Sequence, residues 1–336
     1  MNKKLVIGII GTGRIGKLHT ENIVKNFPNV VVKAVADPFI DGQRDWAKGL
    51  GIEVAYTDYK QIINDPAIEA VIICSSTNTH APISIEAANA GKHIFCEKPI
   101  DYDVDRIQAV LEAVEAAKVK FQIGFNRRFD HNFRAARQAI VDGRVGELQI
   151  VKITSRDPAP PPVEYVKVSG GMFFDMTIHD FDMARYLTGS EVVEVYANAA
   201  CTVDPAIGEA GDIDTALVSL KFANGAIGLI DNCRKAIYGY DQRIEVLGTK
   251  AGIHTENDTL STLVISNNDG VTAEKPKYFF LERYMDSFAN EMREFFEAVA
   301  NDSPTPVCGL DGLKPVLIAI AATESARTGK PVKVQQ

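Results

Sequence analysis

The stretch between residues 5 and 37 constrains the fold of this chain more than any other. It begins with an apolar run that ends at Ile10, continues with the turn Gly-Thr-Gly-Arg-Ile-Gly over residues 11–16, and closes with a second apolar run that stops at Asp37. This order predicts a strand, a glycine-rich turn, a helix and a second strand. Strands joined through a helix run in the same direction, so the pattern indicates a parallel sheet.

Each glycine of this turn has a physical reason. Gly11 would permit the tight turn, Gly13 would let a pyrophosphate approach the backbone, and Gly16 would let helix and strand pack closely. The start of the helix would face the phosphates, because its unpaired N–H groups and dipole favour negative charge. Asp37 follows by about 20 residues, the spacing at which a carboxylate binds an adenosine ribose. The pattern predicts a dinucleotide site, and NAD is favoured over NADP because the Asp37 charge would repel a 2′-phosphate.

Length, charge and cysteine content restrict the function further. The 336 residues allow two domains, and a net charge of −8 without a basic cluster argues against a nucleic-acid partner. We expect neither a signal peptide nor a membrane span, because no apolar run approaches the roughly 18 residues that a span needs. The five cysteines have no metal-ligand spacing. They indicate buried thiols of a cytoplasmic protein with no disulfide and no metal site.

The first part of the chain predicts a Rossmann domain over residues 1–122, built on a doubly wound parallel sheet. After Asp37, helices are expected at 42–50, 81–90 and 104–118, and strands at 70–74, 93–96 and 121–125. Strands that alternate with helices through short connections are typical of this α/β fold. Ligands lie at the carboxyl ends of such strands. The polar turn that begins at Ser75 and the segment Glu97-Lys98-Pro99 should therefore border the cofactor.

The remainder, residues 123–336, predicts an α+β domain. Strands are expected at 148–155, 192–200, 213–222, 226–233 and 242–247. Helices are expected after residue 130 as far as residue 141, and over 170–189, 281–300 and 312–328. Asn224-Gly225 predicts a two-residue hairpin, which favours a largely antiparallel open sheet. The proline-rich residues 158–162 should form a stiff loop. The last helix could pack back on the first domain.

Three residues are candidates for chemistry. Asp175 and His179 stand four apart on a predicted helix, so they share one face, and a carboxylate beside an imidazole raises its basicity. Taken alone, a structural interpretation is favoured for this pair, with Asp175 near the helix start and His179 packed under a sheet. Lys98, at a strand end beside the predicted cofactor, could polarise a hydroxyl or stabilise a developing alkoxide.

Four stretches together resemble the glucose–fructose oxidoreductase/inositol dehydrogenase family (Gfo/Idh/MocA): the glycine turn, residues 90–99, residues 124–129 and residues 175–182. Within that family the chain is most similar to the inositol 2-dehydrogenases. The resemblance covers nearly the whole chain. It implies NAD-dependent oxidation of a ring hydroxyl of a cyclic polyol, with myo-inositol as the expected substrate, in a homo-oligomer, either a tetramer or a dimer, that pairs the open face of the second sheet.

The resemblance also implies site residues. The catalytic set is Lys98, Asp175 and His179. The cofactor-binding set is Gly11, Gly13, Arg14, Ile15, Gly16, Asp37, Ser75, Ser76, Asn78, His80, Glu97 and Lys98. The substrate-binding set is Lys98, Arg127, Asp157, Asp175, His179 and a tyrosine, Tyr238 or the nearby Tyr240.

Several alternatives stay open from the sequence. Some members of the family carry His-Arg-Asn where this chain has Ser155-Arg156-Asp157, so another inositol isomer or a pyranose sugar is a possible substrate. A redox-neutral glycosidase that uses bound NAD is a further alternative. A nucleotide-sensing regulator without turnover is disfavoured, because a sensor has no need of Lys98 and His179.

Overall fold

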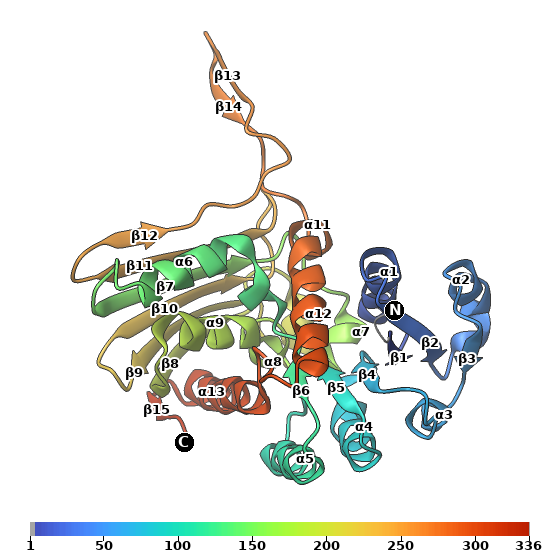
Figure 1. Cartoon of the computed structure of the whole chain (residues 1–336). Helices are drawn as coiled ribbons and strands as arrows, with labels where there is room; N and C mark the ends of the chain where they lie inside the picture. The colour runs from blue at the N-terminus through green and yellow to red at the C-terminus, as the bar shows by residue number, and fades with distance from the viewer. Residues whose placement is uncertain (1–3, 336) are drawn as a thin grey trace. The chain divides into compact units, whose positions relative to one another are not determined.

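The computed structural model, which describes residues 4–335, divides into two compact units (Figure 1). The first unit runs through Asn126 and also contains residues 286–313, and the second contains residues 127–285 and the chain from Lys314 onward. The sequence prediction placed everything after residue 122 in the second domain. The segment 286–313 lies instead in the first unit, because Met292, Phe295 and Phe296 pack in its hydrophobic core.

The first unit contains a six-stranded parallel sheet. The sequence predicts a parallel sheet and five of these strands, but not the short strand at residues 54–56. The strands are β1 (Leu5–Ile10), β2 (Val30–Ala36), β3 (Val54–Tyr56), β4 (Ala70–Ile73), β5 (His93–Cys96) and β6 (Phe121–Ile123). Their order is β3-β2-β1-β4-β5-β6, and every neighbouring pair is parallel. The order reverses between β1 and β4. That point is where doubly wound sheets bind their ligands.

The sequence predicts four helices of the first unit. It does not predict the short helix at residues 60–63, and it assigns the helix at residues 285–300 to the second domain. The helices are α1 (Arg14–Asn26), the 3-10 turn η1 (Ile40–Gln43), α2 (Arg44–Gly49), α3 (Lys60–Ile63), α4 (Thr77–Asn89), α5 (Val104–Ala117) and α12 (Met285–Ala300). Asp103 caps α5 as expected, since its carboxylate accepts hydrogen bonds from the amides of Asp105 and Arg106. Helix α4 begins at Thr77, earlier than the predicted residue 81. The Ser75 turn therefore leads directly into it.

The second unit contains a seven-stranded sheet in the order β12-β11-β7-β10-β9-β8-β15. These strands are β7 (Leu148–Arg156), β8 (Val192–Ala200), β9 (Thr215–Phe222), β10 (Ile227–Cys233), β11 (Asp241–Gly248), β12 (Gly252–His254) and β15 (Val332–Lys333). Only the β7–β10 pair is parallel among the described neighbours, so the expectation of a largely antiparallel sheet is confirmed. The predicted hairpin joins β9 to β10. Its turn is longer than the predicted two residues and includes Ala223, because the amide of Phe222 bonds the carbonyl of Ala226.

One face of this sheet is covered and the other is open. Helices α6 (His131–Val141) and α9 (Ile178–Thr188) lie along the covered face (Figure 1). Residues alternate between buried and exposed along β9 and β11, as a half-covered sheet requires. The other helical segments are η2 (Asn126–Phe129), α7 (Val163–Val166), α8 (Met172–Asp175), α10 (Pro205–Glu209), α11 (Phe280–Arg283) and α13 (Gly309–Thr328). The hairpin of β13 (Val264–Asn267) and β14 (Gly270–Ala273), which the sequence analysis did not predict, stands clear of the sheet.

The predicted single helix over residues 170–189 is wrong in one respect. It is divided into α8 and α9, and the amide of Thr177 bonds the carbonyl of Met172, five residues back. A five-residue bond widens the turn beyond that of a regular α-helix. Asp175 and His179 are therefore not spaced as two residues of one continuous helix. The predicted end at Gly189 is confirmed, with a left-handed φ of 60°.

Two further predictions concern the chain as a whole. Among residues 4–335, no helix combines the length and the apolar character that crossing a membrane would require. The last helix begins at Gly309 rather than at 312 and ends before Gly329. Its first residues belong to the first unit and the rest to the second.

We expect Phe295→Ala to lower the free energy of unfolding by about 3–5 kcal/mol, the usual cost of truncating a core phenylalanine. Phe295 is fully buried, and its ring lies 6.0 Å from the ring of Phe95 between centroids. Leu310→Ala is the control, because this exposed residue should cost less than about 0.5 kcal/mol. Denaturant unfolding measures both. Equal effects would show that residues 286–313 do not complete the first core.

Candidate active site

The glycine turn joins β1 to α1 and rests on the chain that follows β4. Gly11 has a φ of 91°, and a Cβ there would lie 2.5 Å from the amide nitrogen of Ser75. A Cβ on Gly16 would lie 2.0 Å from the carbonyl oxygen of Gly11. A Cβ on Gly13 would meet no described atom within 4 Å. The fold itself requires glycine at 11 and 16, whereas Gly13 leaves open space at the start of α1.

Asp37 follows β2 and lies beside this turn. Its carboxylate accepts hydrogen bonds from the amides of Thr12 and Phe39, both at 2.8 Å. The group is partly exposed, so it can contact a ligand as well as the backbone. An open helix start next to a carboxylate at the end of the second strand fits the pyrophosphate and ribose of a dinucleotide.

The other predicted cofactor residues of the first unit follow β1, β4 and β5. Ser76 and Asn78 are exposed at the start of α4, and Arg14 is exposed at the start of α1. Ser75, Ile15, Glu97 and Lys98 are partly exposed. The carboxyl ends of β1, β2, β4 and β5 thus bring the predicted set to one edge of the sheet. His80 differs from the rest, because it is buried and both ring nitrogens lie against backbone carbonyl oxygens.

A buried cluster that the sequence analysis did not identify lies next to Glu97. The Nε2 atom of His19, on α1, is 2.8 Å from a Glu97 carboxylate oxygen, and Glu291, on α12, is 3.8 Å from the same nitrogen. Burial and the charge of Glu97 raise the pKa of Glu291 well above its usual value. The sequence predicts a helix that includes Glu291, but nothing in it singles out this residue. Its partners could not be read from the sequence.

In the second unit, Asp175 is held by two side chains. Its carboxylate oxygens accept hydrogen bonds from the hydroxyl of Tyr165 at 2.8 Å and from Arg234 at 3.2 Å. Arg234 is almost completely buried, and it also lies 3.8 Å from Asp212. His179, in the first turn of α9, is partly exposed. Tyr165 and Arg234 lie in segments without a recognisable motif, and the sequence analysis missed both.

Asp157 lies in the same electrostatic surroundings. Burial raises the pKa of its carboxyl to about 6, with Arg234 opposing the shift and Asp175 adding to it. Its backbone is fixed on both sides, since its amide bonds Cys233 and its carbonyl accepts from Ala236. Asp157 and Asp175, both predicted to contact substrate, therefore lie close enough to repel each other.

Arg127 and the two candidate tyrosines separate into different groups. Arg127 is buried, forms an ion pair with Asp180 at 2.6 Å, and has the hydroxyl of Tyr240 within 3.5 Å. The hydroxyl of Tyr238 instead accepts from Arg156 at 2.9 Å and donates to Asp241 at 2.6 Å. Of the two tyrosines proposed from the resemblance, Tyr240 is the one beside Arg127. A substrate contact by Tyr238 stays a prediction.

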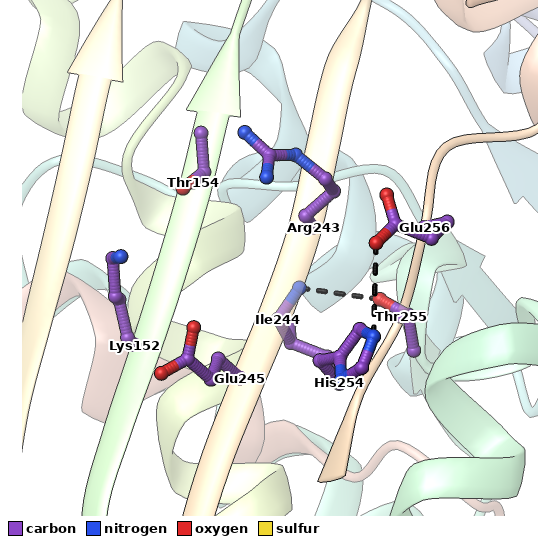
Figure 2. A pocket seen from close by; sticks show the side chains of 8 residues that line it. All are labelled: Lys152, Thr154, Arg243, Ile244, Glu245, His254, Thr255 and Glu256. Atoms are coloured by element: carbon purple, nitrogen blue, oxygen red, sulfur yellow. Dashed lines mark hydrogen bonds and ion pairs between the residues drawn. The ribbon is translucent and has the colours of Figure 1, made fainter.

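A separate hollow lies on the second sheet (Figure 2). It is lined by residues of β7 and β11, by His254 at the end of β12, and by the two residues that follow: Lys152, Thr154, Arg243, Ile244, Glu245, His254, Thr255 and Glu256. Figure 2 shows that the Thr255 hydroxyl accepts from the amide of Ile244, while His254 pairs with Glu256. None of the predicted site residues lines this hollow.

Both units are similar to known proteins. Residues 5–125 match an oxidoreductase family with an NAD-binding Rossmann fold, and residues 133–254 match the GFO/IDH/MocA C-terminal domain. The chain is 46% identical over 330 residues to the myo-inositol 2-dehydrogenase of Thermotoga maritima, with 98% of each chain covered. It is 46% identical over 327 residues to the inositol 2-dehydrogenase of Rhizobium meliloti, which covers 97% of this chain and 98% of the relative.

A solved structure extends this similarity. The scyllo-inositol dehydrogenase of Lactobacillus casei, with bound cofactor NAD(H) and scyllo-inositol, is similar to this chain with a TM-score of 0.93 and 30% identity. The similarity covers 99% of each chain. It extends over both units of the fold.

Two glycine substitutions should separate binding from stability. We expect Gly13→Ala to weaken NADH binding at least about tenfold, because its methyl group would occupy the space that a pyrophosphate needs, while the melting temperature stays close to that of the wild type. Gly16→Ala should instead lower the melting temperature, because its methyl group would clash with the Gly11 carbonyl. Fluorescence titration with NADH and thermal melts measure the two effects. Normal NADH affinity in Gly13→Ala would contradict the assignment of the turn.

Proposed function

Because this chain belongs to the GFO/IDH/MocA oxidoreductase family, we propose that it is an NAD-dependent dehydrogenase that oxidises a ring hydroxyl of myo-inositol to the ketone. The observation that carries the proposal is the full-length similarity to inositol 2-dehydrogenases of two organisms. The second unit supports it, because a polyol needs several charged and polar partners, and Arg127, Asp157 and Asp175 are available there. The similar solved structure from Lactobacillus casei contains scyllo-inositol, so this isomer is the second candidate substrate.

Three residues carry the proposed chemistry. His179 takes the proton of the substrate hydroxyl, and Asp175 supports the imidazolium that results. The contacts of Asp175 with Tyr165 and Arg234 hold this carboxylate in place. Lys98 polarises the substrate oxygen, whose negative charge grows as the proton leaves. Arg127, Asp157 and Tyr238 or Tyr240 would bind the remaining hydroxyl groups.

NAD would be held by the residues at the carboxyl ends of β1, β2, β4 and β5. When bound, it accepts the hydride that leaves the substrate carbon. Asp37 would bind the ribose and select NAD over NADP, because its carboxylate already lies next to the glycine turn and would repel a 2′-phosphate. Neighbouring residues 38–40 are Pro-Phe-Ile and provide no cation for such a phosphate.

We also propose that the protein is a homo-oligomer, a tetramer or a dimer, in the cytoplasm. The open face of the second sheet supports the oligomer, because Ile150, Ile227 and Leu247 lie side by side on neighbouring strands and are each more than 40% exposed. A contiguous exposed apolar patch is typical of an interface. All five cysteines are free thiols, which agrees with a reducing compartment. The expectation that all five are buried is wrong, since only Cys96 is buried and Cys201 and Cys308 are exposed.

Purified protein should reduce NAD stoichiometrically when it is given myo-inositol, measured as the rise in NADH absorbance. We expect myo-inositol to be the preferred substrate in a panel that also contains scyllo-inositol, other inositol isomers and common aldoses. NADP should be a much poorer cofactor. Turnover of an aldose alone would overturn the substrate assignment, and bond cleavage in a glycoside without net NADH would indicate the glycosidase alternative.

His179→Ala and Lys98→Met should both lose turnover while NADH binding persists. We expect His179→Ala to lower kcat about a hundredfold to ten-thousandfold, the usual range for a general base.

Lys98→Met keeps the side-chain length and removes the charge, so kcat should fall with little change in the Kd of NADH. Steady-state kinetics and fluorescence titration measure both quantities. Should Lys98→Met lose only NADH affinity, Lys98 would be a cofactor ligand instead.

A further inference from the structure

Two buried histidines hold the chain on either side of Lys98. The Nε2 atom of His19 lies 2.8 Å from a carboxylate oxygen of Glu97, the residue before Lys98. The Nδ1 atom of His80 lies 2.8 Å from the carbonyl oxygen of Pro99, the residue after it. His19 is completely buried and His80 is 2% exposed, so neither imidazole is directed to solvent. All four of these contacting residues belong to the first unit.

His80 connects this segment to the glycine turn. Its Nε2 atom lies 2.9 Å from the carbonyl oxygen of Ser75, whose backbone packs against Gly11. Both partners of His80 are acceptors. A neutral imidazole has a single N–H and satisfies one of them, whereas the imidazolium satisfies both. Burial lowers the pKa of His80, the two carbonyls and Glu97 raise it, and the charge of Lys98 lowers it. In either state, at least one carbonyl accepts a hydrogen bond from His80.

His19 is fixed by aromatic side chains as well as by Glu97. Its ring meets the edges of Phe95 and Phe288 with centroid distances of 5.3 and 5.6 Å. Glu97 in turn is packed closely, since a Cβ on Gly124 would lie 3.0 Å from its second carboxylate oxygen. Its amide donates to the carbonyl of Ile73 on β4 at 2.9 Å. The Glu97 carboxylate therefore has little freedom to move once His19 donates to it.

The carboxyl group of Glu291 lies beside this arrangement. Both Glu291 oxygens are buried and neither has a hydrogen-bond partner among residues 4–335. His19, Glu97 and Glu291 place ligand atoms within 4.8 Å of one another, a spacing that a cation could also use. The 2.8 Å separation of His19 and Glu97 is that of a direct hydrogen bond, however, and burial together with the charge of Glu97 raises the pKa of Glu291, which favours the uncharged form of this carboxyl group. We therefore interpret the cluster as a positioning device and not as a metal site.

We propose that His19 and His80 are positioning residues that hold Glu97 and Pro99 so that the ammonium group of Lys98 meets the substrate hydroxyl. The inference rests on the proposed function, in which Lys98 polarises that hydroxyl. A displacement of about 1 Å in a reacting group can lower the rate about a hundredfold. A direct contact of His80 with NAD, which the resemblance suggests, would need a ring nitrogen that here faces a backbone carbonyl.

The test uses pairs of amide variants at each position. Glutamine places its nitrogen near the Nε2 position of histidine, and asparagine places its nitrogen near Nδ1. At position 19, where Nε2 contacts Glu97, we expect His19→Gln to keep kcat within about threefold of the wild type and His19→Asn to lose about tenfold or more. At position 80 the order should reverse, with His80→Asn above His80→Gln, because Nδ1 faces Pro99. The Kd of NADH should change less than about threefold in all four.

A second comparison separates positioning from a general loss of structure. On the Lys98→Met background, the same substitutions should change the residual kcat less than about twofold, because no ammonium group remains to be placed. Equal kcat values for the two amides at both positions would overturn the proposal. The same conclusion would follow if the losses in kcat persisted in full without Lys98.

A measurement without turnover keeps this test independent of the substrate assignment. Amide hydrogen exchange of the peptide that contains residues 96–101 should be faster in His80→Gln than in His80→Asn, and faster in His19→Asn than in His19→Gln. A peptide from β11 in the second unit serves as the control and should not change. If the wild type oxidises no inositol but the exchange order holds, the proposed substrate fails and the positioning role stands. The reverse exchange order would overturn the positioning role.

Discussion

The close packing of the glycine turn against the chain after β4 determines much of the first unit. Gly11 leaves no room for a side chain because the Ser75 backbone occupies that position. Ser75 then offers its carbonyl to His80, and His80 reaches Pro99 at the end of the next strand. One backbone contact thus links the predicted phosphate site to the residues around Lys98. The residues proposed to bind the cofactor and those proposed to carry the chemistry are therefore connected through the same backbone contacts.

The second unit depends on buried charges that are paired. Arg127 with Asp180, Arg128 with Asp182, and Arg234 with Asp175 each join an arginine to a carboxylate in or beside α8 and α9. A buried charge that loses its partner costs a large amount of free energy, so each arginine and its carboxylate are held together. The pairs therefore fix the positions of these side chains. At Asp157 the nearby charge of Arg234 does not offset the effect of burial, so the pKa of the carboxyl group is raised to about 6. Such a set of fixed donors and acceptors suits a ligand rich in hydroxyl groups.

Several features could be predicted because they depend on local sequence. The glycine turn, the position of Asp37 at the end of β2, the cap at Asp103 and the end of α9 at Gly189 each follow from a few neighbouring residues. The assignment of residues 286–313 could not be predicted in this way, because an amphipathic helix shows that one face is buried but not which core it joins. The division between α8 and α9, where the amide of Thr177 bonds the carbonyl of Met172, could not be predicted either, because the residue pattern of this segment is that of one continuous helix.

By itself, the sequence determined the type of each domain, the dinucleotide turn and the identity of the ionisable residues, because strand and helix periodicity and glycine spacing are local properties. Tertiary structure alone decided which side chains meet. It placed Tyr240 rather than Tyr238 beside Arg127, brought Arg234 to Asp175, and joined His19 to Glu97 across 78 positions of the chain. Such contacts depend on how distant elements pack, and no periodicity in the sequence records them.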